Sequence, residues 1–230
     1  SMSIDTSAVG AVYFGSSSLL DRSKSLKTEV MALFETTQRA DVEGTDFYHG
    51  NASGMAALAG CIGWMRSGAW DGRLAVVVCS EVAQSALSLG VLAGSAAVAL
   101  LIGPNAPLRV EPEYVSQMRH SAWDLLSPVA TNRVAVVLDS VDAAQWHERC
   151  LIECEEELMT RSGAAAPIGA ADRVVLSALN GVPSAGFLGV RTLQRGVASA
   201  IDGTLERTAA ASQRLPSLVG GAGSATALLG

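Results

Sequence analysis

Hydrophobic and polar positions along the chain form patterns that predict short strands separated by helices. Continuous apolar runs, rich in valine and alanine, are typical of strands covered on both faces of a sheet. Apolar residues that recur every three or four positions predict helices. The predicted strands are 9–14, 74–79, 96–102 and 173–176, and a further pair lies around the glycines of 220–223. The strand at 96–102 is predicted to continue over 108–111. The predicted helices are 21–35, the stretch that follows the turn within 46–58 and continues to about Met65, 141–159 and 184–201.

Strand and helix patterns alternate with short connections, so the sequence predicts the α/β fold class. The run of small residues at 162–167 is the best candidate for a linker between two halves. The predicted domains are therefore an N-terminal half over 4–161 and a shorter C-terminal half over 168–230.

Composition narrows the classes of partner. The chain is 49% hydrophobic and 17% charged, so we expect a large core or an exterior that meets another chain. A formal charge of −6 without any Lys/Arg cluster argues against nucleic acid as a partner. We find no signal peptide and no apolar run with transmembrane flanks, so no membrane partner is predicted and the cytoplasm is the default compartment.

The four cysteines, Cys61, Cys79, Cys150 and Cys154, lack the spacing of a zinc site. They indicate a reducing compartment and packed thiols, with no metal predicted. The run of carboxylates at Glu153 and 155–157 predicts the solvated face of a helix.

The segment 46–58 carries the candidate chemistry, because a turn rich in small polar residues runs directly into an apolar helix there. Unpaired N–H groups at a helix start favour anions and developing negative charge. The turn offers Asn51 and Ser53 but no cysteine, and His49 with Ser53 is a candidate serine–base pair.

Four segments of the chain resemble hydroxymethylglutaryl-CoA synthase. They are Asp21–Thr28, Glu43–Asp46, Trp70–Arg73 and Ala97–Leu108. The resemblance implies a thiolase-like layered α/β/α/β/α sandwich, dimerisation, and binding of acyl-CoA thioesters. It further implies a cysteine that takes an acetyl group from acetyl-CoA, a glutamate that handles protons, and a histidine that assists the second substrate, acetoacetyl-CoA.

On this comparison Asn51 falls at the family's nucleophile position and Ser17 at its glutamate position, while the histidine has no counterpart. The resemblance also marks Ser53, Gly54, Asn180 and Gly181 as substrate-binding residues. An amide cannot form an acyl-enzyme.

We therefore interpret the chain as a relative of the mevalonate-pathway synthases that does not catalyse the condensation. Such a protein would act as a binding protein, or as a regulatory or structural partner of another protein. No cofactor is predicted, and a CoA thioester is the candidate ligand. The expected partners are a second copy, an active paralogue or an acyl carrier protein. Two alternatives stay open: an altered thioester chemistry such as decarboxylation, centred on Asn51, or a true synthase whose catalytic groups come from elsewhere. Whether the chain is an enzyme is left undecided.

Overall fold

The structure is a computed structural model that describes most of the N-terminal part of the chain and one later helix. The described residues are 5–19, 21, 23–37, 40–48, 52–82, 94–111, 115–117, 140–163 and the single positions 175, 225 and 228. The chain divides into two compact units, Ser1–Glu81 with Ala96–Val110, and Val82–Ser95 with Glu111–Gly230. The predicted linker at 162–167 and the two predicted halves stay predictions.

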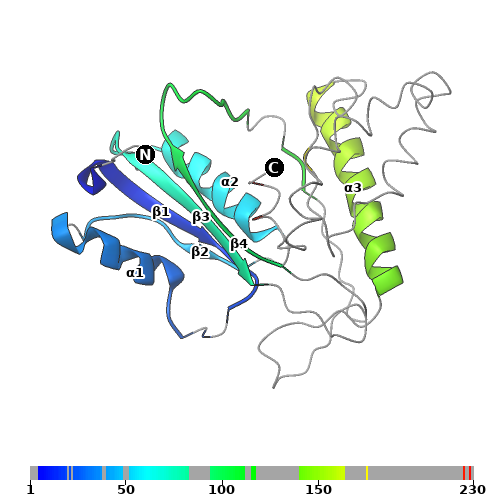
Figure 1. Ribbon diagram of the computed structural model, residues 1–230. Helices are drawn as coiled ribbons and strands as arrows, with labels where there is room; N and C mark the ends of the chain where they lie inside the picture. Colours follow the sequence, from blue (N-terminus) through cyan, green and yellow to red (C-terminus); the bar gives the residue numbers. More distant parts are fainter. Residues whose placement is uncertain are drawn as a thin grey trace. The chain divides into compact units, whose positions relative to one another are not determined.

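A four-stranded sheet forms the first unit, in the order β2–β1–β3–β4 (Figure 1). The strands are β1 (Val9–Gly15), β2 (Asp46–Phe47), β3 (Leu74–Val82) and β4 (Ser95–Ile102). β1 pairs in parallel with both β2 and β3, and Val12 lies opposite Val76. The carboxyl ends of β1 and β3 consequently lie side by side.

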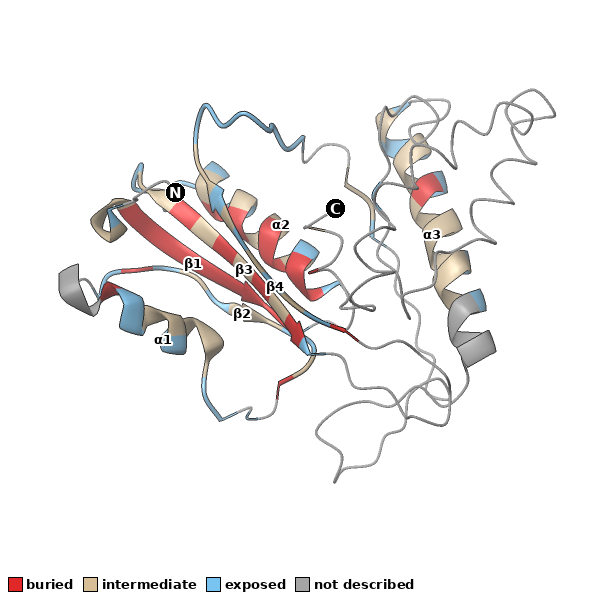
Figure 2. Ribbon diagram, viewed as in Figure 1, coloured by how far each residue is buried: buried red, intermediate tan, exposed pale blue. Residues whose placement is uncertain are grey.

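Helices cover the two faces of β1 (Figure 2). Helix α2 (Ser53–Arg66) packs against one face, where buried residues from β1, β3 and α2 share a core. The shared core consists of Ala11, Tyr13, Ala57, Leu58, Cys61, Trp64, Ala75 and Val77. A second core contains Val9, Val12, Phe34 and Val42, and helix α1 (Leu26–Val30) and the 3-10 helix η2 (Met31–Thr37) contribute residues to it.

The predicted strands at 9–14, 74–79 and 96–102 are confirmed, but their burial differs from the expectation. β1 is buried at every position, whereas buried and half-buried positions alternate along most of β3. Exposed and half-buried positions alternate along β4. Full burial on both faces is thus confirmed for β1, which lies between the two cores. The second face of β3 is only half-buried, although Val76 packs against the second core, and β4 is not buried on either face. The predicted continuation at 108–111 is not a strand, and Leu108 is 86% exposed.

The predicted helix 21–35 is shorter than expected. α1 covers Leu26–Val30 and gives way to a 3-10 helix. Its start is fixed by Asp46 of β2, whose carboxylate accepts hydrogen bonds from the backbone N–H groups of Leu26 (2.7 Å) and Lys27 (2.9 Å). A carboxylate at a helix start satisfies donors that have no partner within the helix. The Lys27 ammonium in turn donates to the Val42 carbonyl at 2.6 Å.

The turn before β3 is closed by Arg73. Its guanidinium donates to the Asp71 carboxylate (2.6 Å) and to the Asp41 carbonyl (2.9 Å). The hydrogen bond from Arg73 lowers the pKa of Asp71. The Trp70 indole donates to the Arg73 carbonyl at 2.8 Å and packs against the α2 core. This turn therefore anchors the start of β3 to the rest of the unit.

In the second unit the structure describes helix α3 (Ser140–Ser162), which confirms the prediction over 141–159. The expectation of a wholly solvated acidic face is wrong at Glu155, which is 4% exposed. Glu155 follows Leu151 by four residues and precedes Leu158 by three, so the helical repeat places it on the apolar side. In the part of the chain that the structure describes, no helix combines the length and the apolar character needed to cross a membrane.

Gly44 offers a test of how the chain before β2 packs against β1. Its φ is +114°, and an added Cβ would lie 1.8 Å from the Val12 carbonyl oxygen. We expect Gly44→Ala to destabilise the protein by about 3 kcal/mol or more, because a left-handed conformation and a backbone clash add together. The control is Gly63→Ala on α2, where an added Cβ meets nothing within 4 Å and alanine should stabilise by about 0.5–1 kcal/mol. Urea denaturation of both variants measures the difference, and equal effects would contradict the packing described.

Candidate functional site

The candidate site lies where the carboxyl ends of β1 and β3 meet the start of α2. In open parallel sheets this is the edge at which ligands bind. β1 ends at Gly15 and is followed by the serine loop, defined here as Ser16–Ser18. β3 brings Glu81 to the same edge, and α2 begins there at Ser53.

Glu81 is the centre of the site, and its side chain is almost wholly buried, with 3% exposure. The backbone N–H of Ser17 donates to both carboxylate oxygens, at 2.9 and 3.0 Å. The hydroxyl groups of Ser17 (2.8 Å) and Ser18 (3.0 Å) donate to Oε2. The Ser53 hydroxyl donates to Oε1 at 2.8 Å. An ionised carboxylate is purely an acceptor, and this set of donors matches it.

The two ends of this cluster differ in their access to solvent. Ser53 is completely buried and Ser16 is 4% exposed, whereas Ser17 is exposed. Ser17 therefore lies at the outer rim of the cluster, and Ser53 lies at its buried side. A ligand that reaches this edge would meet Ser17 first, with the Glu81 carboxylate directly behind it.

The backbone of the site is also closely packed. A Cβ added at Gly15 would lie 2.5 Å from the Ser53 carbonyl oxygen and 2.7 Å from the Gly54 nitrogen. Glycine is required at position 15 because the end of β1 touches the first residues of α2. The helix start and the serine loop are consequently held at a fixed separation.

The charge of Glu81 lies at the start of α2. The residue before the helix, Ala52, makes no side-chain capping bond. Negative charge next to a helix N-terminus is stabilising, because the first N–H groups carry partial positive charge. The chain thus supplies its own anion at the place where the sequence predicted an anion-favouring helix start.

The structure brings together part of the predicted site. Ser17 and Ser53, which lie far apart in the sequence, share Glu81 as their hydrogen-bond acceptor. Gly54 is buried next to them. The remaining predicted residues, Asn51, His49, Asn180 and Gly181, lie outside the described residues, so their roles and the proposed His49–Ser53 pair stay predictions.

Glu81 itself was missed by the sequence reasoning, which ended the strand at Cys79. The signal was present in the two-residue repeat, because Ala75, Val77, Cys79 and Glu81 occupy alternate positions of one strand. These positions face the buried side. A carboxylate at the end of a buried repeat needs hydrogen-bond donors opposite it.

The described cysteines of the first unit do not provide a thiolate. Cys61 and Cys79 have no exposed surface. Burial raises the pKa of the Cys61 thiol to about 11, which confirms its reading as a small packed hydrophobe. Among the described residues, no group of three or more His, Cys, Asp and Glu side chains could hold a metal ion.

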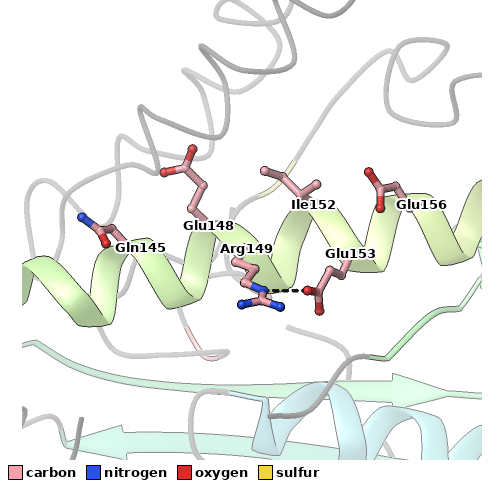
Figure 3. A pocket seen from close by; sticks show the side chains of 6 residues that line it. All are labelled: Gln145, Glu148, Arg149, Ile152, Glu153 and Glu156. Carbon is pink, nitrogen blue, oxygen red and sulfur yellow. Dashed lines mark hydrogen bonds and ion pairs between the residues drawn. The ribbon is translucent and has the colours of Figure 1, made fainter. Parts of the chain in front are cut away.

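A separate hollow of about 440 Å³ lies along α3 in the second unit (Figure 3). It is lined by Gln145, Glu148, Arg149, Ile152, Glu153 and Glu156. Arg149 pairs with Glu153 at 2.8 Å and lies over the Trp146 ring at 5.2 Å. These are ordinary contacts of an amphipathic helix surface, and the hollow shares no residue with the Glu81 cluster.

Comparison with known proteins identifies related chains. Residues 1–107 match the family model described as the N-terminal part of hydroxymethylglutaryl-coenzyme A synthase. The mitochondrial hydroxymethylglutaryl-CoA synthase of Sus scrofa is 37% identical over 148 residues, which is 64% of this chain and 29% of that protein. A hydroxymethylglutaryl-CoA synthase of Zymoseptoria tritici is 37% identical over 158 residues, covering 67% of this chain and 33% of that protein. The match therefore spans about a third of these relatives.

Two solved structures share the fold. One is MvaS in complex with 3-hydroxy-3-methylglutaryl coenzyme A, with a TM-score of 0.75 and 22% identity over 98% of this chain and 59% of that chain. The other is the HMG synthase of the curacin biosynthetic pathway in complex with acetyl donor-ACP, with a TM-score of 0.78 and 17% identity over 96% of this chain and 55% of that chain. The predicted thiolase-like α/β fold is confirmed by this likeness.

The Cys61 thiol gives a prediction for the pH dependence of stability. Its pKa is raised from 9.0 to about 11 in the folded state. The stability contributed by the buried neutral thiol is therefore present below pH 9 and lost as the pH rises towards 11, by about 2 kcal/mol. We expect Cys61→Ala to be less stable than the wild type at pH 7, with a smaller loss between pH 9 and 11. Denaturation midpoints across this range measure it, and identical slopes for both proteins would contradict it.

Proposed function

The chain belongs to the hydroxymethylglutaryl-CoA synthase family, and from that premise we propose that it binds an acyl thioester without forming an acyl-cysteine. The proposed site is the edge formed by the serine loop, the end of β3 and the start of α2. The observation that carries the proposal is the Glu81 cluster, in which Ser17, at the position that the resemblance gives to a glutamate, is a hydrogen-bond donor.

The absence of a thiol at position 51 supports the non-covalent part of the proposal. Asn51 stands where the resemblance places the nucleophilic cysteine. An amide has no thiolate form and cannot take an acetyl group near neutral pH. Cys61 cannot replace it, because it lies within the core and its pKa is about 11. Loss of a nucleophile costs several powers of ten in rate.

The binding part of the proposal rests on the backbone arrangement of β1, β3 and the start of α2. α2 still begins at the carboxyl ends of two parallel strands, and the Gly15 contact holds that start in place. Related structures have been solved with 3-hydroxy-3-methylglutaryl coenzyme A and with an acyl carrier protein. We propose the same chemical class here, a thioester on coenzyme A or on the phosphopantetheine arm of a carrier protein.

Glu81 favours a neutral acyl group over a charged one. Its carboxylate already lies at the start of α2, through Ser53 at 2.8 Å. A second carboxylate placed in this poorly solvated region would be repelled. Acetyl and acetoacetyl thioesters therefore suit the site better than malonyl-type thioesters.

This argument bears on the second candidate function, an altered thioester chemistry centred on Asn51. Decarboxylation of a malonyl-type thioester would bring a carboxylate to the site, next to Glu81. The third candidate is a synthase whose missing groups are supplied by another chain. A heterodimer with an active paralogue would suit that candidate, because a second copy of this chain carries the same Asn51 and Ser17. Either a homodimer or such a heterodimer would suit a bracing role.

Mass spectrometry with three thioesters tests the proposal. We expect acetyl-CoA to stabilise the purified protein against heat, with no acetyl adduct on the protein and no turnover of acetyl-CoA, acetoacetyl-CoA or malonyl-CoA. Malonyl-CoA should bind about tenfold or more weakly than acetyl-CoA, because one unfavourable charge contact costs a kilocalorie or more.

The matched variants are Asn51→Cys and Asn51→Ala. Asn51→Cys should gain a covalent acetyl adduct if position 51 faces the thioester, whereas Asn51→Ala should retain binding. Turnover of malonyl-CoA that disappears in Asn51→Ala would support the altered chemistry instead. No stabilisation by any thioester would overturn the binding proposal, and recovery of a stable hetero-oligomer would then favour the bracing role.

A further inference from the structure

The Glu81 carboxylate has a role that goes beyond tolerating or excluding a ligand. We infer that Glu81 is the positioning residue of this edge: a built-in anion that fixes the serine loop and the first turn of α2 relative to each other. We call this linkage of Ser17, Ser18 and Ser53 through Glu81 the clamp. Its consequence for ligand binding rests on the proposed function, but the clamp itself does not.

The hydrogen bonds of Glu81 join three separate stretches of chain. Ser17 and Ser18 follow β1, Ser53 begins α2, and Glu81 lies near the end of β3. The Ser17 backbone N–H is bound by both oxygens, which orients the peptide as well as the side chain. A single side chain therefore links two segments that lie more than 30 residues apart in the sequence.

An uncharged side chain of similar size would not do the same. Glutamine could accept hydrogen bonds at one oxygen, but its NH₂ group would face donors at the other. Leucine would fill the volume and leave the Ser53 hydroxyl, which is buried, without this acceptor. The arrangement is thus specific for an anionic, two-oxygen acceptor.

The Gly15 contact lies between the same two segments. The end of β1 lies against the Ser53 carbonyl, at a distance that leaves no room for a Cβ. The hydrogen bonds of Glu81 hold the neighbouring loop and helix start across this same contact. Loss of the carboxylate would remove the hydrogen bonds to Ser17 and Ser18 on one side and to Ser53 on the other, and it would leave the Gly15 contact in place.

Chemical rescue tests this inference. Glu81→Ala leaves a space lined by serine donors next to a helix start, and formate carries the missing carboxylate group. We expect the variant to melt about 8–15 °C below the wild type, since one buried and several partly buried charge-assisted hydrogen bonds are lost. Formate should recover at least half of that loss, whereas chloride at the same ionic strength should not. The measurement uses the full chain without any thioester.

Three controls separate a positioning carboxylate from simple packing. Formate should have no effect on the wild type or on Glu29→Ala, which removes an exposed carboxylate on α1. Glu81→Asp should recover more stability than Glu81→Gln or Glu81→Leu, although aspartate fills less space. Stability of Glu81→Leu equal to the wild type, or equal rescue by chloride and formate, would overturn the inference.

If Glu81→Ala does not fold, the test becomes refolding in formate, where recovery of a cooperative transition supports the clamp and continued failure overturns it. Failure of the proposed function gives a different result. In that case the wild type would not respond to acetyl-CoA, while formate would still rescue Glu81→Ala.

Discussion

The buried carboxylate of Glu81 is the constraint on which this edge of the fold depends. Removing an ionised carboxylate from water is costly unless hydrogen bonds replace those of the solvent. Here the replacement comes from Ser17, Ser18 and Ser53. The loop after β1 and the start of α2 must therefore approach β3 together, and the parallel pairing of β1 with β3 is what allows them to do so.

The segments that resemble the family contain residues whose contacts stabilise the fold. Asp46 caps α1, Lys27 binds the Val42 carbonyl, and Arg73 closes the turn before β3. Gly103 lies against the Leu74 side chain, where an added Cβ would be 2.4 Å from a methyl carbon. These residues hold the sheet and its helices, and none belongs to the Glu81 cluster. The resemblance over these segments therefore follows the fold more closely than the chemistry, which is the usual relation between fold and function.

The extent to which the sequence predicted this structure follows from the length and regularity of each pattern. β1, β3 and β4 were predictable because each is a continuous apolar run, and α2 and α3 because apolar residues recur every three or four positions. α1 was predicted too long, since its apolar spacing continues into a 3-10 helix, and its start depends on Asp46 from a distant strand. The two-residue repeat of β3 places Glu81 on the buried side, but its partners Ser17 and Ser53 could not be predicted, because only the folded chain brings them to it. Periodicity within one element cannot reveal a contact among three.

If the site served only to pack the fold, an apolar side chain at position 81 would be expected, and the chain has a carboxylate there instead. An apolar side chain at position 81 would cover the same face of the sheet without the desolvation cost of a charge. What a carboxylate adds is direction, because it holds a backbone N–H and three hydroxyl groups in one arrangement. That arrangement keeps the exposed Ser17 in a fixed position over a buried negative charge. The ligand binding proposed above would use this geometry, because packing of the core alone does not require hydrogen bonds in a fixed direction.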